Sequence, residues 1–143
     1  MARKRPLRNA GTVVVLEHRS RILADNALGD PHVRKLGVWL PREYDDRSGG
    51  PGRRFPVLYD LVGFTGSGLS HVNWKPFGDN VPERAARLIH EGKMGPVIIV
   101  FPDCFTALGG NQYVNSPAIG DYADYLTQEV IPFVDRQFRT LAR

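Results

Sequence analysis

The stretch FPVLYDLVGFTGSGLS, residues 55–70, decides the fold because it joins an apolar run directly to a glycine-rich turn. Its first half is nearly continuous in apolar residues, which is typical of a strand covered on both faces in a parallel sheet. Its second half holds Gly63, Gly66 and Gly68, and such a loop brings bare backbone N–H groups up to a ligand. The stretch therefore predicts a buried strand followed by a loop suited to a negative charge.

The segments after this loop complete a strand–helix–strand unit. A second continuous apolar run, GPVIIVFPD, occupies residues 95–103. Between the two runs, Asn80 is a candidate N-cap, Glu83 stands where a capping box needs it, and Gly92 is the expected end of the helix. The apolar stripe of this helix consists of Val81, Ala85, Leu88 and Ile89. Strand, helix and strand in this order predict a right-handed βαβ crossover.

The remaining elements lie on either side of this unit. A short apolar strand is expected at residues 13–16, and residues 45–54 are expected to form a glycine-rich loop. Between them, residues 32–44 alternate as a strand does, with two faces formed by Leu36, Val38 and Leu40 and by Lys35, Gly37 and Trp39. A last helix is expected from Asp121, and Pro132 should kink or restart it, because proline removes one helical hydrogen bond.

Composition bounds the class of protein. The 143 residues are 42% hydrophobic and 24% charged, as in one globular domain with a core. The net charge is +4 and much of the excess lies at the start of the chain, so we expect residues 1–11 to be a basic flexible segment and residues 12–143 to form the domain. We find no basic face interleaved with aromatic residues, so nucleic acid is not an expected partner. No apolar run suits a membrane span or a signal peptide, which leaves the cytoplasm as the default location.

Three kinds of anion site were compared for the glycine-rich loop. A phosphate-binding P-loop needs a lysine after the glycines, and none follows here. A dinucleotide fingerprint needs G-x-G-x-x-G opening into a helix, and GSGLSH, residues 66–71, lacks the last glycine. An oxyanion hole needs only preorganised backbone N–H groups after a parallel strand, which this loop can offer. A plain glycine-rich turn remains the alternative.

Four segments, in this order and spacing, resemble the esterase branch of the α/β-hydrolase fold, which includes S-formylglutathione hydrolase, enterochelin esterase, feruloyl esterases and mycolyltransferases. They are VWLPREYD, FPVLYDLVGFTGSG, VIIVFPD and YADYLTQEVIPFVDRQFRT, and the resemblance spans residues 20–141. It implies the N-terminal part of an α/β-hydrolase fold, with a mostly parallel sheet, an antiparallel early strand and an end before the nucleophile-elbow strand. It also implies a small-molecule ester as substrate.

The resemblance assigns roles to a few residues of this chain. Gly63 takes the place of the motif glycine, and the backbone N–H of Phe64 takes the place of the first oxyanion donor. The histidine that often precedes this glycine is replaced by Val62, but only backbone is needed for the donor. The resemblance also implies that Trp74, Tyr113 and Asn115 line the substrate pocket.

The nucleophile of such an esterase is a serine in G-x-S-x-G. None of the five serines has glycine at both the −2 and the +2 position: Ser20, Ser48, Ser67, Ser70 and Ser116. None of the histidines can be assigned as the catalytic one, so no catalytic residue is expected in this chain. We therefore expect the N-terminal portion of a serine esterase or acyl-hydrolase that is inactive alone. The alternatives are a non-catalytic binding module and a non-functional truncated remnant.

Other reactive side chains are expected to be structural. Cys104 excludes an internal disulfide and reads as a small semi-buried thiol rather than a nucleophile with His71 as its base. The four histidines and one cysteine are scattered, so neither a metal nor a cofactor is expected. We expect solvated side chains at His18, His32 and His90, a structural role for Glu129, and helix capping by Asp121 and Asp124.

Two further expectations concern the strand of residues 55–62. Asp60 would be costly to bury unpaired, so it should either face Arg53 or Arg54 or mark an earlier end of the strand. By the usual strand order of the resembling fold, this strand would also be an open edge. A flat apolar edge favours self-association with another chain.

Overall fold

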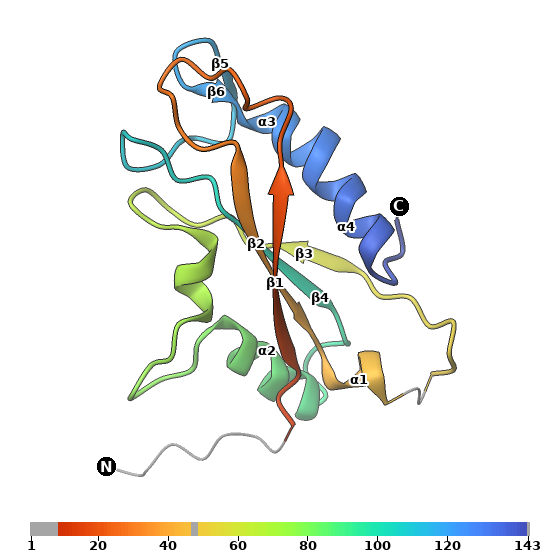
Figure 1. Cartoon of the computed structure of the whole chain (residues 1–143). Coiled ribbons are helices and arrows are strands. Elements are labelled where there is room, and N and C mark those ends of the chain that lie inside the picture. The colour runs from red at the N-terminus through yellow and green to blue at the C-terminus, as the bar shows by residue number, and fades with distance from the viewer. Residues whose placement is uncertain (1–8, 47–48, 143) are drawn as a thin grey trace.

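The computed structural model describes residues 9–46 and 49–142 and contains a mixed four-stranded sheet with helices on both faces (Figure 1). The strand order is β1-β2-β4-β3, formed by β1 (Thr12–Arg19), β2 (Val33–Leu40), β4 (Ile98–Pro102) and β3 (Val57–Tyr59). β2 pairs antiparallel with both β1 and β4, whereas β3 pairs parallel with β4. β2 is thus the strand that opposes the direction of its three companions, which confirms the expected α/β sheet with an antiparallel early strand.

The two faces of β2 pack into two different cores, as its alternation predicts. Leu36 and Val38 are fully buried with Val100 and the C-terminal helical segment, whereas Trp39 is buried with Phe101 on the face that α2 (Val81–His90) covers. β4 lies between β2 and β3 and is buried along its whole length. This placement explains its continuous apolar sequence, because a central strand covered on both faces has no solvent side.

The ends of α2 are the ones predicted from the sequence. Asn80 Oδ1 accepts a hydrogen bond from the Glu83 N–H at 2.9 Å, and Glu83 Oε2 accepts one from the Asn80 N–H at 3.2 Å. This reciprocal capping box satisfies two N–H groups that the first turn leaves without helical partners. Gly92 follows the helix in the left-handed region, with φ of +70°, which a glycine adopts without steric cost.

The C-terminal helical segment is continuous but changes its winding before Pro132. α3 (Tyr122–Asp124) leads into a π-helical segment (Tyr125–Val130), which leads into α4 (Ile131–Gln137). Proline has no N–H to donate, and its ring crowds the carbonyl one turn earlier, so a wider turn at this point relieves both problems. The apolar stripe stays on the sheet, with Tyr122, Tyr125, Val130 and Val134 fully buried.

The start of this segment corrects one expectation. Asp121 occupies the N-cap position of α3, but neither its side chain nor that of Asp124 makes a capping hydrogen bond, and the Asp121 backbone is not in the extended conformation typical of an N-cap. The side chain of Asn115 supplies the acceptor instead, because its Oδ1 lies 3.0 Å from the N–H of Asp124. Asn115 belongs to β5 (Asn115–Ser116), which pairs with β6 (Gly120–Asp121) in a small hairpin.

β3 is shorter and more exposed than its sequence predicts. It ends at Tyr59, and the side chain of Leu58 is 51% exposed because β3 lies at an edge of the described sheet. Burial on both faces was therefore a wrong prediction for this strand, whereas its edge position was correct. Just before β3, the Phe55 N–H donates to Arg139 O and the Leu141 N–H donates to Phe55 O, both at 2.9 Å. The chain after α4 thus begins to run parallel alongside the open edge.

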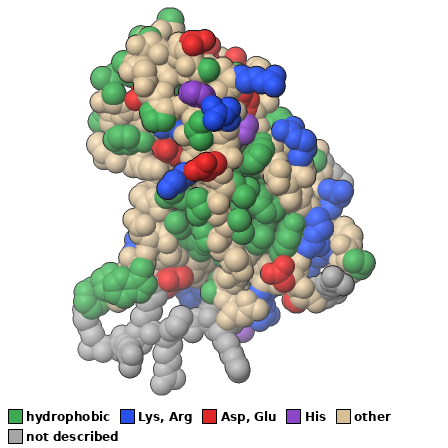
Figure 2. Space-filling view, in the orientation of Figure 1, with side chains coloured by type: hydrophobic (Ala, Val, Ile, Leu, Met, Phe, Trp, Pro, Cys, Tyr) green, Lys and Arg blue, Asp and Glu red, His purple; other side chains and the backbone are tan. Residues whose placement is uncertain are grey.

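Two short helices, α1 (Arg42–Asp45) and a 3₁₀ helix (Gly68–Val72), lie in connections. β1 is longer than predicted, and its Val15 is 52% exposed. Figure 2 shows hydrophobic side chains gathered across the middle of the face on which β1 lies in Figure 1. Most of the predicted N-terminal segment, and part of the loop at residues 45–54, fall outside the described residues. Within the described ranges, no helix is long and apolar enough to cross a membrane.

Candidate active site

The candidate site is formed by two loops at the carboxyl ends of β3 and β4. Because these strands are parallel, the loops of residues 60–72 and 103–114 leave the sheet at the same end, where both strands finish. They meet through hydrogen bonds that include those from the Thr65 N–H to Gly109 O at 2.7 Å and from the Tyr113 hydroxyl to Val62 O at 2.5 Å. The glycine-rich turn is therefore held against a second loop rather than projecting alone.

Two adjacent amides in this turn, those of Gly63 and Phe64, lack acceptors among the described residues, as do those of Leu61 and Val62 before them, whereas Thr65 and Gly66, which follow, are paired. The Gly66 N–H donates to Gly63 O at 3.1 Å and closes a tight turn, in which Thr65 has a φ of +67°. Gly63 and Phe64 are exposed, and neither backbone N–H donates to any acceptor within the described part of the chain. The Phe64 side chain is 65% exposed and lies against Gly109, where an added Cβ would come within 3.3 Å of the ring.

The far end of the turn is packed against β4. At Gly68, an added Cβ would lie 2.5 Å from Pro102 O, so only glycine allows the loop to approach the strand end this closely. Ser67 Oγ donates to Asp103 Oδ1 at 3.3 Å, which ties the same part of the loop to the residue after β4. The glycines of this stretch thus serve two needs, an open turn at Gly63 and close packing at Gly68.

Asp60 and His71 are paired by a hydrogen bond across the base of the loop. Asp60 Oδ2 lies 2.5 Å from His71 Nδ1, and the two side chains are 20% and 39% exposed. The predicted partners Arg53 and Arg54 are not the ones found, because β3 ends before Asp60 and turns the carboxylate toward the returning loop. The alternative prediction, that Asp60 marks an earlier strand end, is correct.

A buried arginine organises the residues after β4. Arg34 is 3% exposed, and its Nη1 lies 3.4 Å from Asp103 Oδ2 and donates to Phe105 O at 2.7 Å. Its Nη2 donates to the Tyr122 hydroxyl at 2.8 Å, which joins the loop to α3. The sequence analysis missed this residue, although an arginine in the alternating segment 32–44 could have signalled a buried polar partner.

Cys104 lies beside this network and is buried, as expected of a small packed thiol. Burial raises the pKa of its thiol to about 12, and the negative charge of Asp103 adds to this effect while Arg34 opposes it. A thiol with this pKa is protonated near neutral pH and is a poor nucleophile. Burial is the main cause that raises the pKa of Tyr113, and electrostatic repulsion from Cys104 and Asp60 adds to it. The Tyr113 hydroxyl therefore keeps its proton and donates a hydrogen bond to Val62 O.

Comparison with known proteins places the chain in a family. The family model described as "Putative esterase" matches residues 31–143. The chain belongs to this family. Its fold is that of the α/β-hydrolase esterases, since a ferulic acid esterase superposes with a TM-score of 0.70 at 22% identity, over 92% of this chain and 45% of that chain.

Two other solved structures agree in fold. A ferulic acid esterase from Anaeromyces mucronatus has a TM-score of 0.63 at 20% identity, over 92% of this chain and 44% of that one. An S-formylglutathione hydrolase from Agrobacterium tumefaciens has a TM-score of 0.57 at 15% identity, over 98% and 48% respectively. The chain thus spans less than half the length of the esterases that it resembles in fold. No curated protein matches its sequence at a significant level.

The residues predicted to bind substrate in an esterase lie in different surroundings. Tyr113 contacts the glycine-rich turn through Val62. Trp74 is 74% exposed in the connection between the 3₁₀ helix and α2, and Asn115 caps α3. Of these three, the described contacts join only Tyr113 to the glycine-rich turn, through Val62 O.

The serine hydroxyls in the described ranges bind groups other than histidines. Ser20 Oγ donates to Glu129, Ser67 Oγ donates to Asp103, and Ser70 Oγ donates to Ser67 O at 2.6 Å. Ser116 Oγ accepts from the Ala118 N–H at 3.2 Å. A serine–histidine pair of the esterase type is therefore not formed within this part of the molecule.

Glu129 has the structural role that was expected of it. It accepts hydrogen bonds from the Ser20 hydroxyl and from the Arg21 N–H at 2.8 Å, which fixes the chain after β1 onto the π-helical segment. Burial pushes the pKa of Glu129 up, but these hydrogen bonds and the nearby His18 outweigh burial and hold the pKa below its usual value. His18 was wrongly expected to be solvated, since its ring lies 4.9 Å from the ring of Phe133 and 3.7 Å from Glu129.

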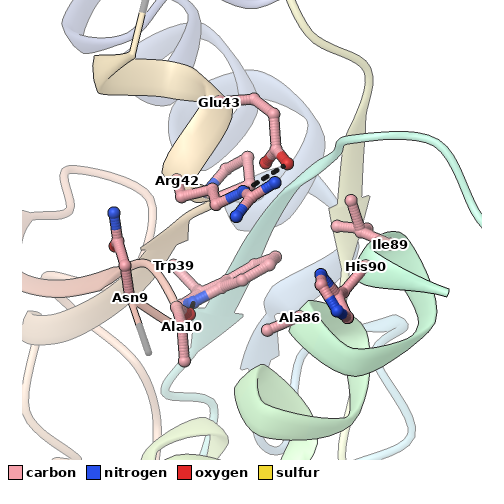
Figure 3. A pocket seen from close by; sticks show the side chains of 9 residues that line it. Asn9, Ala10, Trp39, Arg42, Glu43, Ala86, Ile89 and His90 are labelled. Atoms are coloured by element: carbon pink, nitrogen blue, oxygen red, sulfur yellow. Dashed lines mark hydrogen bonds and ion pairs between the residues drawn. The ribbon is translucent and has the colours of Figure 1, made fainter. Parts of the chain in front are cut away.

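A cavity of about 550 Å³ lies at the other end of the sheet (Figure 3). Trp39 and Pro41, at the end of β2, line it together with Ile89 and His90 of α2. Because β2 is antiparallel to β4, this cavity is at the opposite end of the sheet from the glycine-rich turn. In the described ranges, no three side chains among His, Cys, Asp and Glu gather closely enough to hold a metal ion.

Proposed function

We propose that this chain supplies the first oxyanion donor of a serine esterase through the backbone N–H of Phe64, in the turn that Gly63 opens. Cleavage of an ester passes through a tetrahedral intermediate in which the former carbonyl oxygen carries negative charge. A preorganised N–H group aimed at this oxygen lowers the barrier by about 3–4 kcal/mol. The unpaired amides of Gly63 and Phe64, at the carboxyl end of a parallel strand, are the observation that carries this proposal.

Rigidity of the surrounding turn supports the proposal. Thr65 and Gly66, which follow the unpaired amides, both donate hydrogen bonds, and Tyr113 holds the carbonyl of Val62 that precedes them. A donor fixed in this way needs little reorganisation when charge develops, which is the source of its catalytic advantage. Membership of the esterase family makes an acyl-transfer intermediate the natural anion for this site.

The nucleophile of this proposal is a serine outside these 143 residues. In the intact enzyme, that serine attacks the acyl carbon of a small-molecule ester, and a histidine takes its proton and passes it to the leaving alcohol. The 143-residue chain alone should therefore show no serine-dependent hydrolysis of p-nitrophenyl acetate above the buffer rate. Turnover that is abolished by a serine-directed phosphonate would contradict this placement of the nucleophile.

The donor role is tested by a matched pair of variants in the polypeptide translated from the complete coding sequence. Phe64→Pro removes the backbone N–H, whereas Phe64→Ala keeps it and removes only an exposed side chain. Loss of one oxyanion donor should lower kcat by about 10²–10³-fold in the proline variant, with a much smaller effect in the alanine variant. Equal kcat values in two folded variants would refute the assignment.

A second candidate is a non-catalytic binding module, or a remnant without function. It is favoured by the engagement of every described serine hydroxyl in contacts that involve no histidine. The coding sequence downstream of Arg143 separates the two candidates. A G-x-S-x-G motif soon after it supports the esterase, and a stop codon at that position supports the second candidate.

A further inference from the structure

We infer that Asp60 and His71 form a clasp that positions the glycine-rich turn, with His71 as a positioning residue for the unpaired amides. The pair joins the two ends of the loop that carries Gly63 and Phe64, with His71 Nδ1 lying 2.5 Å from Asp60 Oδ2. The catalytic meaning of the clasp rests on the proposed function, but its effect on the loop does not.

One end of the clasp is fixed to the sheet. The Asp60 N–H donates to Val100 O at 2.9 Å, so the residue continues the β3–β4 ladder by one hydrogen bond although the strand itself has ended. Its carboxylate is only 20% exposed, and an unpaired carboxylate at this depth is unfavourable. The His71 imidazole is its hydrogen-bond partner and removes this cost whether the ring is neutral or charged, provided that Nδ1 carries the proton.

The other end lies on the returning part of the loop. His71 belongs to the 3₁₀ helix, whose first residue, Gly68, is packed directly on the end of β4. Between Asp60 and Gly68, the turn is held only by contacts to the neighbouring loop, through Gly109 and Tyr113, and by the contact of Ser67 with Asp103. Without the clasp, Asp60 and Gly68 would keep their separate contacts with β4, and the residues between them would be positioned by the described contacts to the second loop.

The pair resembles the base and its orienting acid in a hydrolase, but its surroundings favour a positioning role. The hydroxyls of Ser67 and Ser70, in the same loop as His71, donate to Asp103 and to Ser67 O. The Ser116 hydroxyl accepts from the Ala118 N–H, and no described contact joins any of these serines to His71. The imidazole therefore has no nucleophile to activate within the described ranges. Its contribution is the link from the sheet, through Asp60, to the far side of the turn.

Amide hydrogen exchange of the 143-residue chain, followed by NMR, tests the clasp without any catalytic assay. The reporters are the Thr65 amide, which donates to Gly109 O of the neighbouring loop, and the Gly66 amide, which donates to Gly63 O within the turn. The Ile99 and Val100 amides of β4 report global opening. His71→Ala removes the donor. His71→Asn keeps an N–H donor close to the position of Nδ1 without the ring. His90→Ala, on the exposed end of α2, is the matched control.

We expect exchange of Thr65 and Gly66 to be about tenfold faster in His71→Ala, the size of effect that a lost hydrogen bond to a charged group gives. Exchange should stay within about twofold of the parent in His71→Asn and in His90→Ala. Asp60→Ala, which removes the acceptor, should reproduce the His71→Ala result if the latter variant folds poorly. Unchanged exchange in His71→Ala, equal acceleration at Ile99 and Val100, or a His71→Asn variant as fast as His71→Ala would each overturn the clasp. None of these results would affect the Phe64→Pro test of the proposed function.

Discussion

Removing the buried guanidinium of Arg34 should destabilise this protein more than removing any exposed charge. The side chain is 3% exposed and holds three groups at once: the Asp103 carboxylate at 3.4 Å, Phe105 O at 2.7 Å and the Tyr122 hydroxyl at 2.8 Å. The substitution Arg34→Met keeps most of the apolar volume and removes all three contacts. It therefore isolates the polar part of the interaction.

The magnitude follows from the burial of these groups. Breaking a buried ion pair by removing one partner costs about 3–5 kcal/mol, but the Asp103 side chain is 23% exposed and can recover some hydration. The Arg34 Nε is buried without a partner among the described residues, so its removal also relieves an existing cost of about 1 kcal/mol. The net loss in the free energy of unfolding should be about 3 kcal/mol, a large part of the stability of an ordinary domain.

Urea denaturation at neutral pH, followed by tryptophan fluorescence, measures this loss. Arg42→Met is the matched control, because Arg42 is 49% exposed and its one ion pair with a described residue is to its neighbour Glu43, so its loss should cost less than about 1 kcal/mol. Arg34→Lys should remain well below the parent, since one ammonium group cannot reach three separated acceptors as a guanidinium fork does. A loss below about 1 kcal/mol in Arg34→Met, or equal losses in both methionine variants, would refute the reasoning.

Three further outcomes are expected. The pKa of Glu129 in the folded protein lies below the ordinary carboxyl value of 4.5. The stability that Glu129 contributes is therefore complete above pH 4.5 and is lost as the pH falls through the folded pKa. Glu129→Gln should flatten the acid side of a curve of unfolding free energy against pH, and an unchanged curve would contradict this. Cys104, with a pKa of about 12, should react with Ellman's reagent at pH 8 only after denaturation, and fast labelling of the native protein would show that it is accessible as thiolate. We also propose that the open edge of β3, where Leu58 is exposed, promotes self-association. Light scattering during size-exclusion chromatography should then detect oligomers of the parent chain that a Leu58→Lys variant does not form. A purely monomeric parent would count against this proposal.

Local signals in the sequence were sufficient for the elements that neighbouring residues determine. The capping box of Asn80 and Glu83, the alternation of β2 and the continuous apolar run of β4 depend on residues close in the chain. The change of winding before Pro132 follows from the chemistry of proline alone. The resemblance that indicated the esterase family also came from the sequence, and the match over residues 31–143 confirms it.

The contacts that shape the candidate site were decided by the tertiary structure. Asp60 meets His71 only because β3 ends early and its loop returns, and Arg34 meets Asp103 and Tyr122 only because β2 lies beside β4. Neither pairing has a periodic or short-range signal, since a carboxylate or a guanidinium can be satisfied by any partner that the fold brings near. The sequence by itself therefore determined the order of the main strands and helices and which loop is rich in glycine, but not the lengths of β1 and β3 or the short elements α1, β5 and β6. The packing of that loop against its neighbour determined which of its amides stay unpaired, because hydrogen bonds between segments far apart in the chain exist only once the sheet has placed them together.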